Sequence, residues 1–178
     1  MKPKKVWRFE NSMFRLYIKD NSKLLNDCFD FDWKCSKIEK LLTSLGCTAY
    51  DIGDVYEGMR FFYPNIKNTY KHFSSFTPAS GIIPCLGSNS LAEIIMHTPG
   101  LLDRVNLNLS KIDLHFVSTN ATRCQIKELE VIKQMNPDKF IIRYQFMELL
   151  VHMAKERYAI KAKAKNKVST DLTIVDAI

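Results

Sequence analysis

The chain has 178 residues, of which 46% are hydrophobic, and it carries a formal net charge of +7. This is enough apolar material for a packed core, which argues against wholesale disorder, and no apolar run approaches the roughly 18–20 residues that span a bilayer. The positive charge favours an acidic partner; nucleic acid, an anionic membrane and the acidic surface of microtubules all meet that requirement.

The amino terminus is a basic arm, predicted over residues 1–22. It carries Lys2, Lys4, Lys5 and Arg8. Charged residues interrupt any apolar segment behind it, which makes a secretory signal a poor interpretation. The five cysteines are scattered without a CxxC pair, and this favours reduced thiols in the cytoplasm over a disulfide framework.

The next segment, 23–63, is predicted to be helical in part. Ser36 precedes Glu39 by three residues, a capping-box spacing that predicts a helix start, and Gly46 is placed to end that helix. The stretch Thr48–Gly58 is predicted to be a connector.

Residues 64–160 show the order helix, loop, helix, linker, helix, loop, helix. Pro64 is predicted in the first turn of the first helix. Each loop holds an apolar, β-prone pair, Ile82–Ile83 in the first and Ile141–Ile142 in the second. This order is the outline of two EF-hands packed face to face, with the apolar pairs forming a two-stranded bridge.

Local signals predict where the remaining helices begin and end. Ser90 and Glu93 form a second capping box, and Asn108 or Ser110 caps the following helix. The last helix is predicted over Tyr144–Tyr158. The expected fold class is therefore mostly α: EF-hand-like helix pairs, a calmodulin-like half, with degenerate loops, an amino-terminal helical or extended segment and a basic carboxyl-terminal tail.

The loops are not expected to hold calcium, which needs six to eight oxygen ligands. No Asp or Glu lies between Thr77 and Ser90. In the second loop, the ligand positions offer only Asp138 beside Asn136, and Lys139 stands where the turn glycine belongs. Asn136 and Asp138 remain weak metal candidates, and no cofactor is predicted.

Five stretches carry a family resemblance when taken together. They are CFDFDWKCSKI (28–38), YKHFSSF (70–76), IPCLGSNSLAEI (83–94), SKIDLHFVSTN (110–120) and NPDKFIIRYQFMELLVHMAKERY (136–158). These stretches resemble the degenerate EF-hand-like segments of ciliate and other protist proteins associated with cilia and axonemes. The resemblance implies a structural role in the cytoskeleton of the cilium, with tubulin or other axonemal proteins as partners, and it defines no functional residues.

Residue patterns for catalysis are weak throughout the chain. The four histidines are dispersed, and no phosphate-binding glycine loop is present. Glu148 and His152 are predicted to be solvated neighbours on a helix. The acidic cluster of Asp27, Asp30 and Asp32 is predicted to pair with its basic neighbours Lys23, Lys34 and Lys37, and a metal site there is the less favoured alternative. We therefore expect neither an enzyme nor a small-molecule substrate.

Two alternative functions stay open beside the axonemal one. The helix order is compatible with a calcium-responsive sensor, and the charge with a basic nucleic-acid-binding module. Nucleic acid is the less favoured partner because the aromatic residues do not interleave with the basic ones.

Candidate partner contacts lie at both ends of the chain and in an aromatic segment that either anchors a partner or packs on the core. They are Lys2, Lys4, Lys5, Arg8, Phe31, Trp33, Lys161, Lys163, Lys165 and Lys167. The tail over 161–178 is predicted to be a solvated basic extension. The loops Thr77–Ser90 and Ser118–Asp138 are the other predicted contact surfaces.

Overall fold

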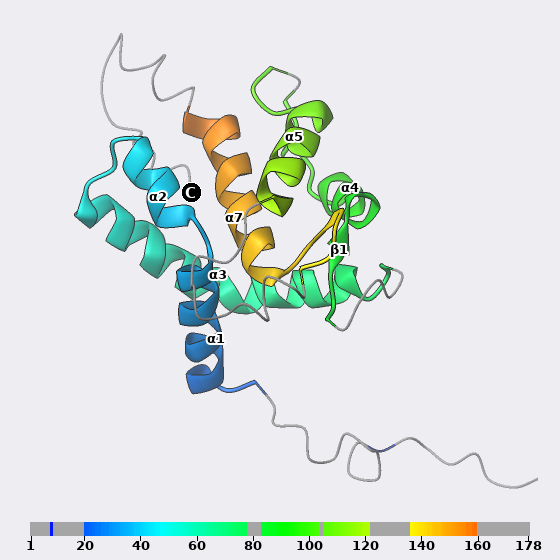
Figure 1. The fold of residues 1–178 in the computed structure, drawn as a ribbon, viewed down its shortest axis with the longest axis horizontal. Helices are drawn as coiled ribbons and strands as arrows, with labels where there is room; N and C mark the ends of the chain where they lie inside the picture. The colour runs from blue at the N-terminus through cyan, green and yellow to red at the C-terminus, as the bar shows by residue number, and fades with distance from the viewer. Residues whose placement is uncertain (1–7, 9–19, 78–82, 104, 122–135, 160–178) are drawn as a thin grey trace, which may run out of the picture.

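The structure is a computed structural model that describes residues 8, 20–77, 83–103, 105–121 and 136–159. The described part is mostly helical, as predicted. Its elements (Figure 1) are α1 Ser22–Cys35, α2 Ile38–Ser44, α3 Ala49–Ser74, β1 Leu86–Gly87, α4 Ser88–Met96, α5 Leu109–Asn120, β2 Phe140–Ile141, α7 Arg143–Ala154 and the π-helix η2 Lys155–Ala159. Within this part of the chain, no helix combines the length and apolar character needed to cross a membrane.

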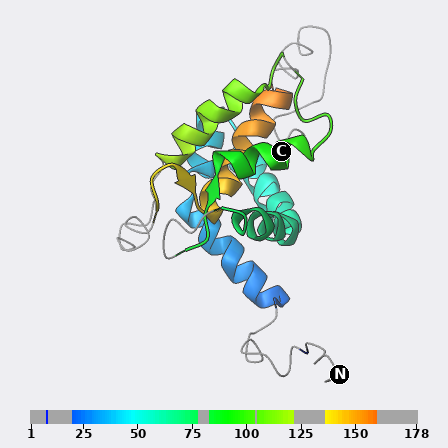
Figure 2. The same ribbon diagram turned by 90° about the vertical axis from the view of Figure 1, so that its right-hand side faces the viewer.

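Helix α7 lies at the centre of the molecule, between α5 on one side and α1 and α3 on the other (Figures 1 and 2). Phe146 and Leu149 belong to a cluster shared with α4 and α5. Met147 and Val151 belong to a second cluster shared with α1, α2 and α3. Because α7 is buried on several sides, it joins the two halves of the core.

Aromatic side chains fill the amino-terminal half of the core. Phe29 and Trp33 of α1 are buried and pack against Tyr56 and Tyr63 of α3. The ring centroids of Phe29 and Tyr63 are 5.3 Å apart, and those of Trp33 and Tyr56 are 5.1 Å apart, both edge-on. Of the two interpretations of the aromatic segment, core packing therefore applies to Phe29, Trp33 and Tyr63.

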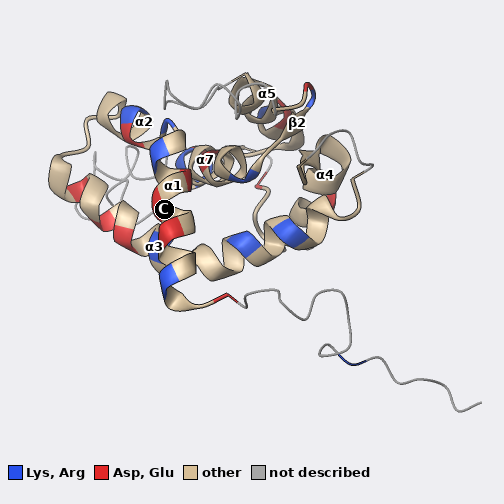
Figure 3. Ribbon diagram, turned by 60° about the horizontal axis from the view of Figure 1, so that its bottom comes forward, with Lys and Arg blue, Asp and Glu red and all other residues tan. Residues whose placement is uncertain are grey.

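Helix α3 begins at Ala49, so the predicted connector over Thr48–Gly58 and the predicted helix start at Pro64 are wrong. Thr48 and Asp51 form a reciprocal capping box that starts the helix 15 residues earlier. Pro64 lies inside this helix, where it removes a backbone hydrogen-bond donor, and the helix bends near its middle (Figure 3). Burial of apolar side chains on both sides of Pro64 stabilises the helix by more than the proline destabilises it. The predicted boundary between 63 and 64 falls inside this helix.

Two short strands connect the helix pairs. Leu86 pairs with Ile141 and Gly87 with Phe140 in an antiparallel ladder. Ile141 is confirmed as a strand residue, whereas the bridging residue of the first loop is Leu86 and not Ile83. Leu86 is fully buried in the α4–α5 core, and a Cβ at Gly87 would lie 3.1 Å from the Phe140 ring. Burial and close approach therefore decide the register.

Two of the predicted helix ends are confirmed, and one predicted helix start is wrong. Gly46 has a φ of +85° just beyond α2, and the Asn108 side chain accepts from the third N–H of α5, as expected. Ser36 instead ends α1, and Glu39 accepts from the indole N–H of Trp33.

The second capping box is also absent. Helix α4 begins at Ser88 after Gly87, so Ser90 is its third residue rather than its cap. Strand pairing of Leu86–Gly87 places the helix start three residues earlier than the side-chain pattern suggested.

Arg157 fastens η2 to the segment that joins α4 to α5. Its guanidinium donates to the carbonyl oxygen of Leu101 at 2.9 Å and to an Asp103 carboxylate oxygen at 2.9 Å. Hydrogen bonds from the Leu107 and Asn106 backbone N–H groups, together with Arg157, lower the pKa of Asp103 to about 2 against the opposing effect of desolvation. The carboxylate thus organises this linker in its charged form.

Lys139 adopts a left-handed conformation, with a φ of 67°, immediately before β2. A non-glycine residue there is strained by roughly 1 kcal/mol. We expect Lys139→Gly to raise the free energy of unfolding by about 0.5–1 kcal/mol in urea titrations, because relief of the strain exceeds the added entropy of the unfolded chain. Lys34→Gly, inside α1, is the matched control and lowers stability by up to about 1 kcal/mol. A loss of stability in Lys139→Gly would contradict the assigned backbone conformation.

Candidate functional site

The two loops meet at the β1–β2 ladder, and the second loop is closed by Gln145. This side chain is fully buried. Its Oε1 accepts the Ile142 backbone N–H at 3.0 Å, and its Nε2 donates to the carbonyl oxygens of Thr119 and Asn120 at 3.1 and 3.2 Å. The Asn120 side chain in turn donates to the Phe140 carbonyl oxygen of β2. The third residue of α7 is thereby tied directly to the last turn of α5.

The first loop repeats this arrangement with smaller side chains. The hydroxyl oxygens of Ser90, the third residue of α4, and Thr77 lie 3.1 Å apart. The Gly87 backbone N–H donates to the same Thr77 oxygen at 3.4 Å. In both loops, the third residue of the helix after the loop is hydrogen-bonded to the end of the helix before it. Ser90 contacts Thr77, just beyond α3, and Gln145 contacts the last two residues of α5. Neutral hydrogen bonds hold these positions together.

The predicted metal candidates Asn136 and Asp138 differ in their surroundings. Asn136 is buried, and Asp138 is exposed. Among the residues that the structure describes, no group of three or more His, Cys, Asp and Glu side chains is arranged to hold a metal ion. A hard cation requires six to eight oxygens, and carbonyl oxygens of the second loop already accept hydrogen bonds from amide groups.

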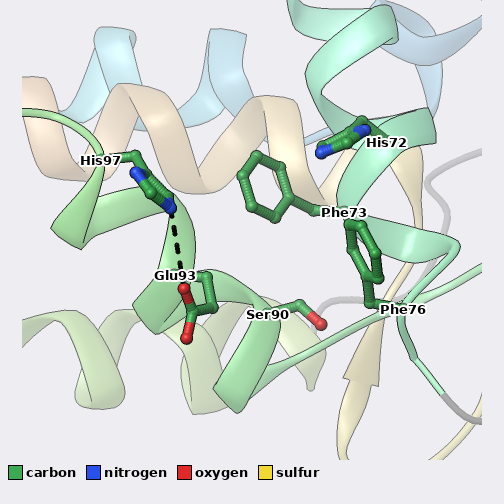
Figure 4. A pocket seen from close by; sticks show the side chains of 6 residues that line it. All are labelled: His72, Phe73, Phe76, Ser90, Glu93 and His97. Carbon is green, nitrogen blue, oxygen red and sulfur yellow. Dashed lines mark ion pairs between the residues drawn. The ribbon is translucent and has the colours of Figure 1, made fainter.

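A cleft of about 600 Å³ opens between the end of α3 and α4. It is lined by His72, Phe73, Phe76, Ser90, Glu93 and His97 (Figure 4). Figure 4 shows the Phe73 ring between the helices, on the side of the Glu93–His97 pair, whose Oε2 and Nε2 atoms are 3.8 Å apart. Phe76 is 67% exposed. The cleft therefore suits an aromatic or aliphatic side chain of a partner, flanked by a polar rim.

A buried ionic network joins three helices beside these loops. The Asp32 carboxylate of α1 is 2% exposed. It accepts the Tyr63 hydroxyl of α3 at 2.5 Å and both Nε and Nη2 of Arg143 of α7, at 2.5 and 3.1 Å. Asp32 therefore pairs with a distant arginine, and not with the nearby lysines that the sequence suggested.

The network shifts the pKa values of its members. Burial first, and then the charge and hydrogen bond of Asp32, raise the pKa of Tyr63 well above its usual range. Burial on its own lowers the pKa of Arg143, but the hydrogen bond and charge of Asp32 outweigh it and raise that pKa. Asp32 and Arg143 thus form a fixed ion pair, with neutral Tyr63 as an additional donor.

Glu148 and His152 are also not the solvated pair that was predicted. Glu148 is 3% exposed, and one of its carboxylate oxygens accepts the Lys37 backbone N–H at 2.9 Å, which satisfies the start of α2. Its other oxygen lies 3.9 Å from His152 Nε2. The His152 ring stacks on His115 of α5 with centroids 5.0 Å apart, and His115 Nε2 lies 3.8 Å from Glu156.

The predicted partner contacts fall into three groups. Arg8 is exposed, and Lys2, Lys4, Lys5 and the four tail lysines lie outside the described residues. Phe31 is half-exposed and lines a second cleft, of about 320 Å³, with Asp32 and Arg143. Trp33 is a core residue, because packing of α1 on α3 buries its ring, so it is withdrawn as a partner contact.

Several site residues could not be identified from the sequence. The Asp32–Arg143 pair joins positions 111 residues apart, and no local spacing signals it. The aromatic wall of the large cleft was inside a predicted helix, but only the position of α4 makes Phe73 and Phe76 line a cavity. Phe61 and Phe62 of α3 are aromatic residues that the structure leaves exposed.

Comparison with known proteins does not assign the chain to a family. No protein-family model, curated protein or solved structure matches the chain.

Removing the Tyr63 hydroxyl tests the ionic network. We expect Tyr63→Phe to lower the free energy of unfolding by about 1.5–3 kcal/mol, because the buried Asp32 carboxylate loses a donor. Tyr56→Phe is the matched control, since its partner Asp30 is only partly buried, and it costs less than about 1 kcal/mol. Equal losses in the two variants would contradict a special role for the Asp32 network.

The histidine stack predicts a pH dependence. Burial, and then the neighbouring His152, lower the pKa of His115, with partial compensation by Glu156. A depressed folded-state pKa stabilises the protein above the unfolded pKa of about 6.5, and that stabilisation is lost as the pH falls through the folded pKa. We expect His115→Gln to flatten the stability profile between about pH 7.5 and 5. Urea titrations across this interval measure it, and parallel profiles would refute the assignment.

Proposed function

We propose that this chain is a non-enzymatic structural component of the ciliary axoneme that binds microtubules or microtubule-associated partners. It acts through an EF-hand-like domain that does not bind calcium. The absence of calcium binding is inferred from the hydrogen bonds between neutral side chains and backbone groups that connect the two ends of each loop. The axonemal part is supported by the family resemblance, and the partner by the net charge of +7.

The helix order supports the EF-hand-like description. Helix α3 leads through β1 into α4, helix α5 leads towards β2 and α7, and the two strands pair antiparallel. With Leu86 and Ile141 as the bridging residues, the twelfth loop positions are Ser90 and Gln145, where an ordinary EF-hand has a bidentate glutamate. Both side chains are engaged with the protein itself.

This arrangement removes the usual reason for a conformational response to calcium. In a sensor, the ion connects the outgoing helix to the loop and opens the helix pair. Here the Gln145 amide makes the corresponding connection to Thr119 and Asn120. The domain is therefore a fixed scaffold that presents the cleft between α3 and α4 and the basic ends of the chain to partners.

Co-sedimentation with microtubules polymerised from purified tubulin tests this function. We expect pelleting of the full chain to fall as salt rises, because exposed charges supply the attraction, and to be the same in calcium and in a calcium chelator. Replacing Lys161, Lys163, Lys165 and Lys167 by Glu lowers affinity at least about tenfold.

A matched control keeps the test specific. The double variant Lys34→Glu and Lys40→Glu changes exposed charges on α1 and α2, and it retains most of the binding. No salt-sensitive pelleting would overturn microtubule binding. Stoichiometric calcium heat in titration calorimetry would overturn the calcium-free domain. A tagged copy absent from cilia would overturn the axonemal location.

A further inference from the structure

The second cleft, of about 320 Å³, lies where four segments of the chain meet. Its walls come from α1, from the later part of α3, from the residues ahead of β1 and from the start of α7. Two of the lining side chains are charged, Asp32 and Arg143, and the others offer mainly apolar surface: Phe31, Tyr70, Ile83, Pro84, Ile142 and Tyr144. An apolar cleft with a polar anchoring point is the usual composition of a small-molecule site, and this volume suits a compact ligand.

The walls of this cleft are held in place by the core. Tyr70 and Tyr144 are buried. The Tyr70 hydroxyl donates to the Pro84 carbonyl oxygen at 2.6 Å, which fixes the segment ahead of β1 against α3. Phe31, which is 40% exposed, is the aromatic ring of the lining that solvent reaches most. A ligand therefore meets a largely preformed cleft, and little ordering of the protein opposes binding.

Arg143 uses only one edge of its guanidinium within the protein. Nε and Nη2 donate to the two carboxylate oxygens of Asp32, a side-on arrangement. The guanidinium is a planar group with five N–H donors. Its outer edge, formed by Nη1 and the second N–H of Nη2, makes no hydrogen bond with a residue that the structure describes. The side chain is 30% exposed and lines the cleft, so this edge is available to a planar oxyanion.

The charge balance of the cleft determines what kind of anion it accepts. The buried Asp32 carboxylate is already compensated by Arg143 and by the Tyr63 hydroxyl. Because the Asp32–Arg143 pair is neutral as a whole, an anion gains little from charge alone, and apolar contact has to supply the rest. We propose that this cleft binds a compact carboxylic acid, with the carboxylate on the outer edge of Arg143 and a single ring or branched chain against the apolar walls.

Three small probes separate the contributions of charge and apolar contact. Phenylacetate carries both groups, phenylacetamide has nearly the same shape without the charge, and acetate has the charge without the ring. In NMR titrations of the isotope-labelled full chain, phenylacetate is expected to give saturable shifts with a dissociation constant of about 0.1–1 mM. The constant for phenylacetamide is at least about tenfold higher, because the guanidinium edge loses its charged acceptor. Acetate gives no saturable shifts at the same concentrations.

Substitutions place the bound probe in this cleft. Arg143→Lys keeps a positive charge beside Asp32 but removes the planar fork, so it raises the dissociation constant of phenylacetate at least about tenfold and leaves that of phenylacetamide nearly unchanged. Ile83→Trp fills the cleft without altering the ion pair, and it abolishes binding of both compounds. Arg60→Lys is the matched control, since Arg60 is a partly exposed arginine of α3 that does not line the cleft, and it changes neither constant.

Thermal unfolding verifies that each variant is folded, and Ile83→Trp keeps the test decisive if Arg143→Lys fails to fold. Absence of saturable phenylacetate binding to the unaltered chain would overturn the proposal. Equal affinity for phenylacetate and phenylacetamide would also overturn it, as would undiminished binding to folded Ile83→Trp. These outcomes are independent of microtubule pelleting, so failure here leaves the proposed function standing.

Discussion

The burial of α7 among the other helices is the constraint on which the rest of the structure depends. Phe146 and Leu149 complete one core cluster, and Met147 and Val151 complete the other. A helix buried in this way leaves its polar side chains without water, so each needs a partner within the protein. Arg143, Gln145 and Glu148 find theirs in α1, α5 and the start of α2.

These polar contacts give the domain a specific geometry as well as stability. The Asp32–Arg143 pair sets α7 against α1, and Gln145 sets it against α5. Replacing an ionic or amide contact by apolar packing often preserves stability, so we interpret these groups as fixing the relative placement of the helices. The hydrogen bonds of Gln145 to Thr119 and Asn120 hold the start of α7 to the end of α5, which supports the proposed role as a fixed scaffold.

The proposed binding to a partner is supported by the charge in the sequence and by exposed side chains among the described residues. The basic ends of the chain suit an acidic partner, whereas the outer face of α3 carries both signs of charge and several aromatic rings.

The sequence by itself determined the helical class, the lack of carboxylates in the first loop, the helix end at Gly46, the helix start at Asn108, and the strand at Ile141. These features depend on residues close together in the chain, so spacing and residue type are sufficient to find them. Only the tertiary structure decided the continuity of α3 through Pro64 and the register at Leu86. It also decided the burial of Trp33 and the pairing of Asp32 with Arg143. Each of these features depends on side chains that are distant in the sequence, and the spacing of neighbouring residues does not indicate which of them will be in contact.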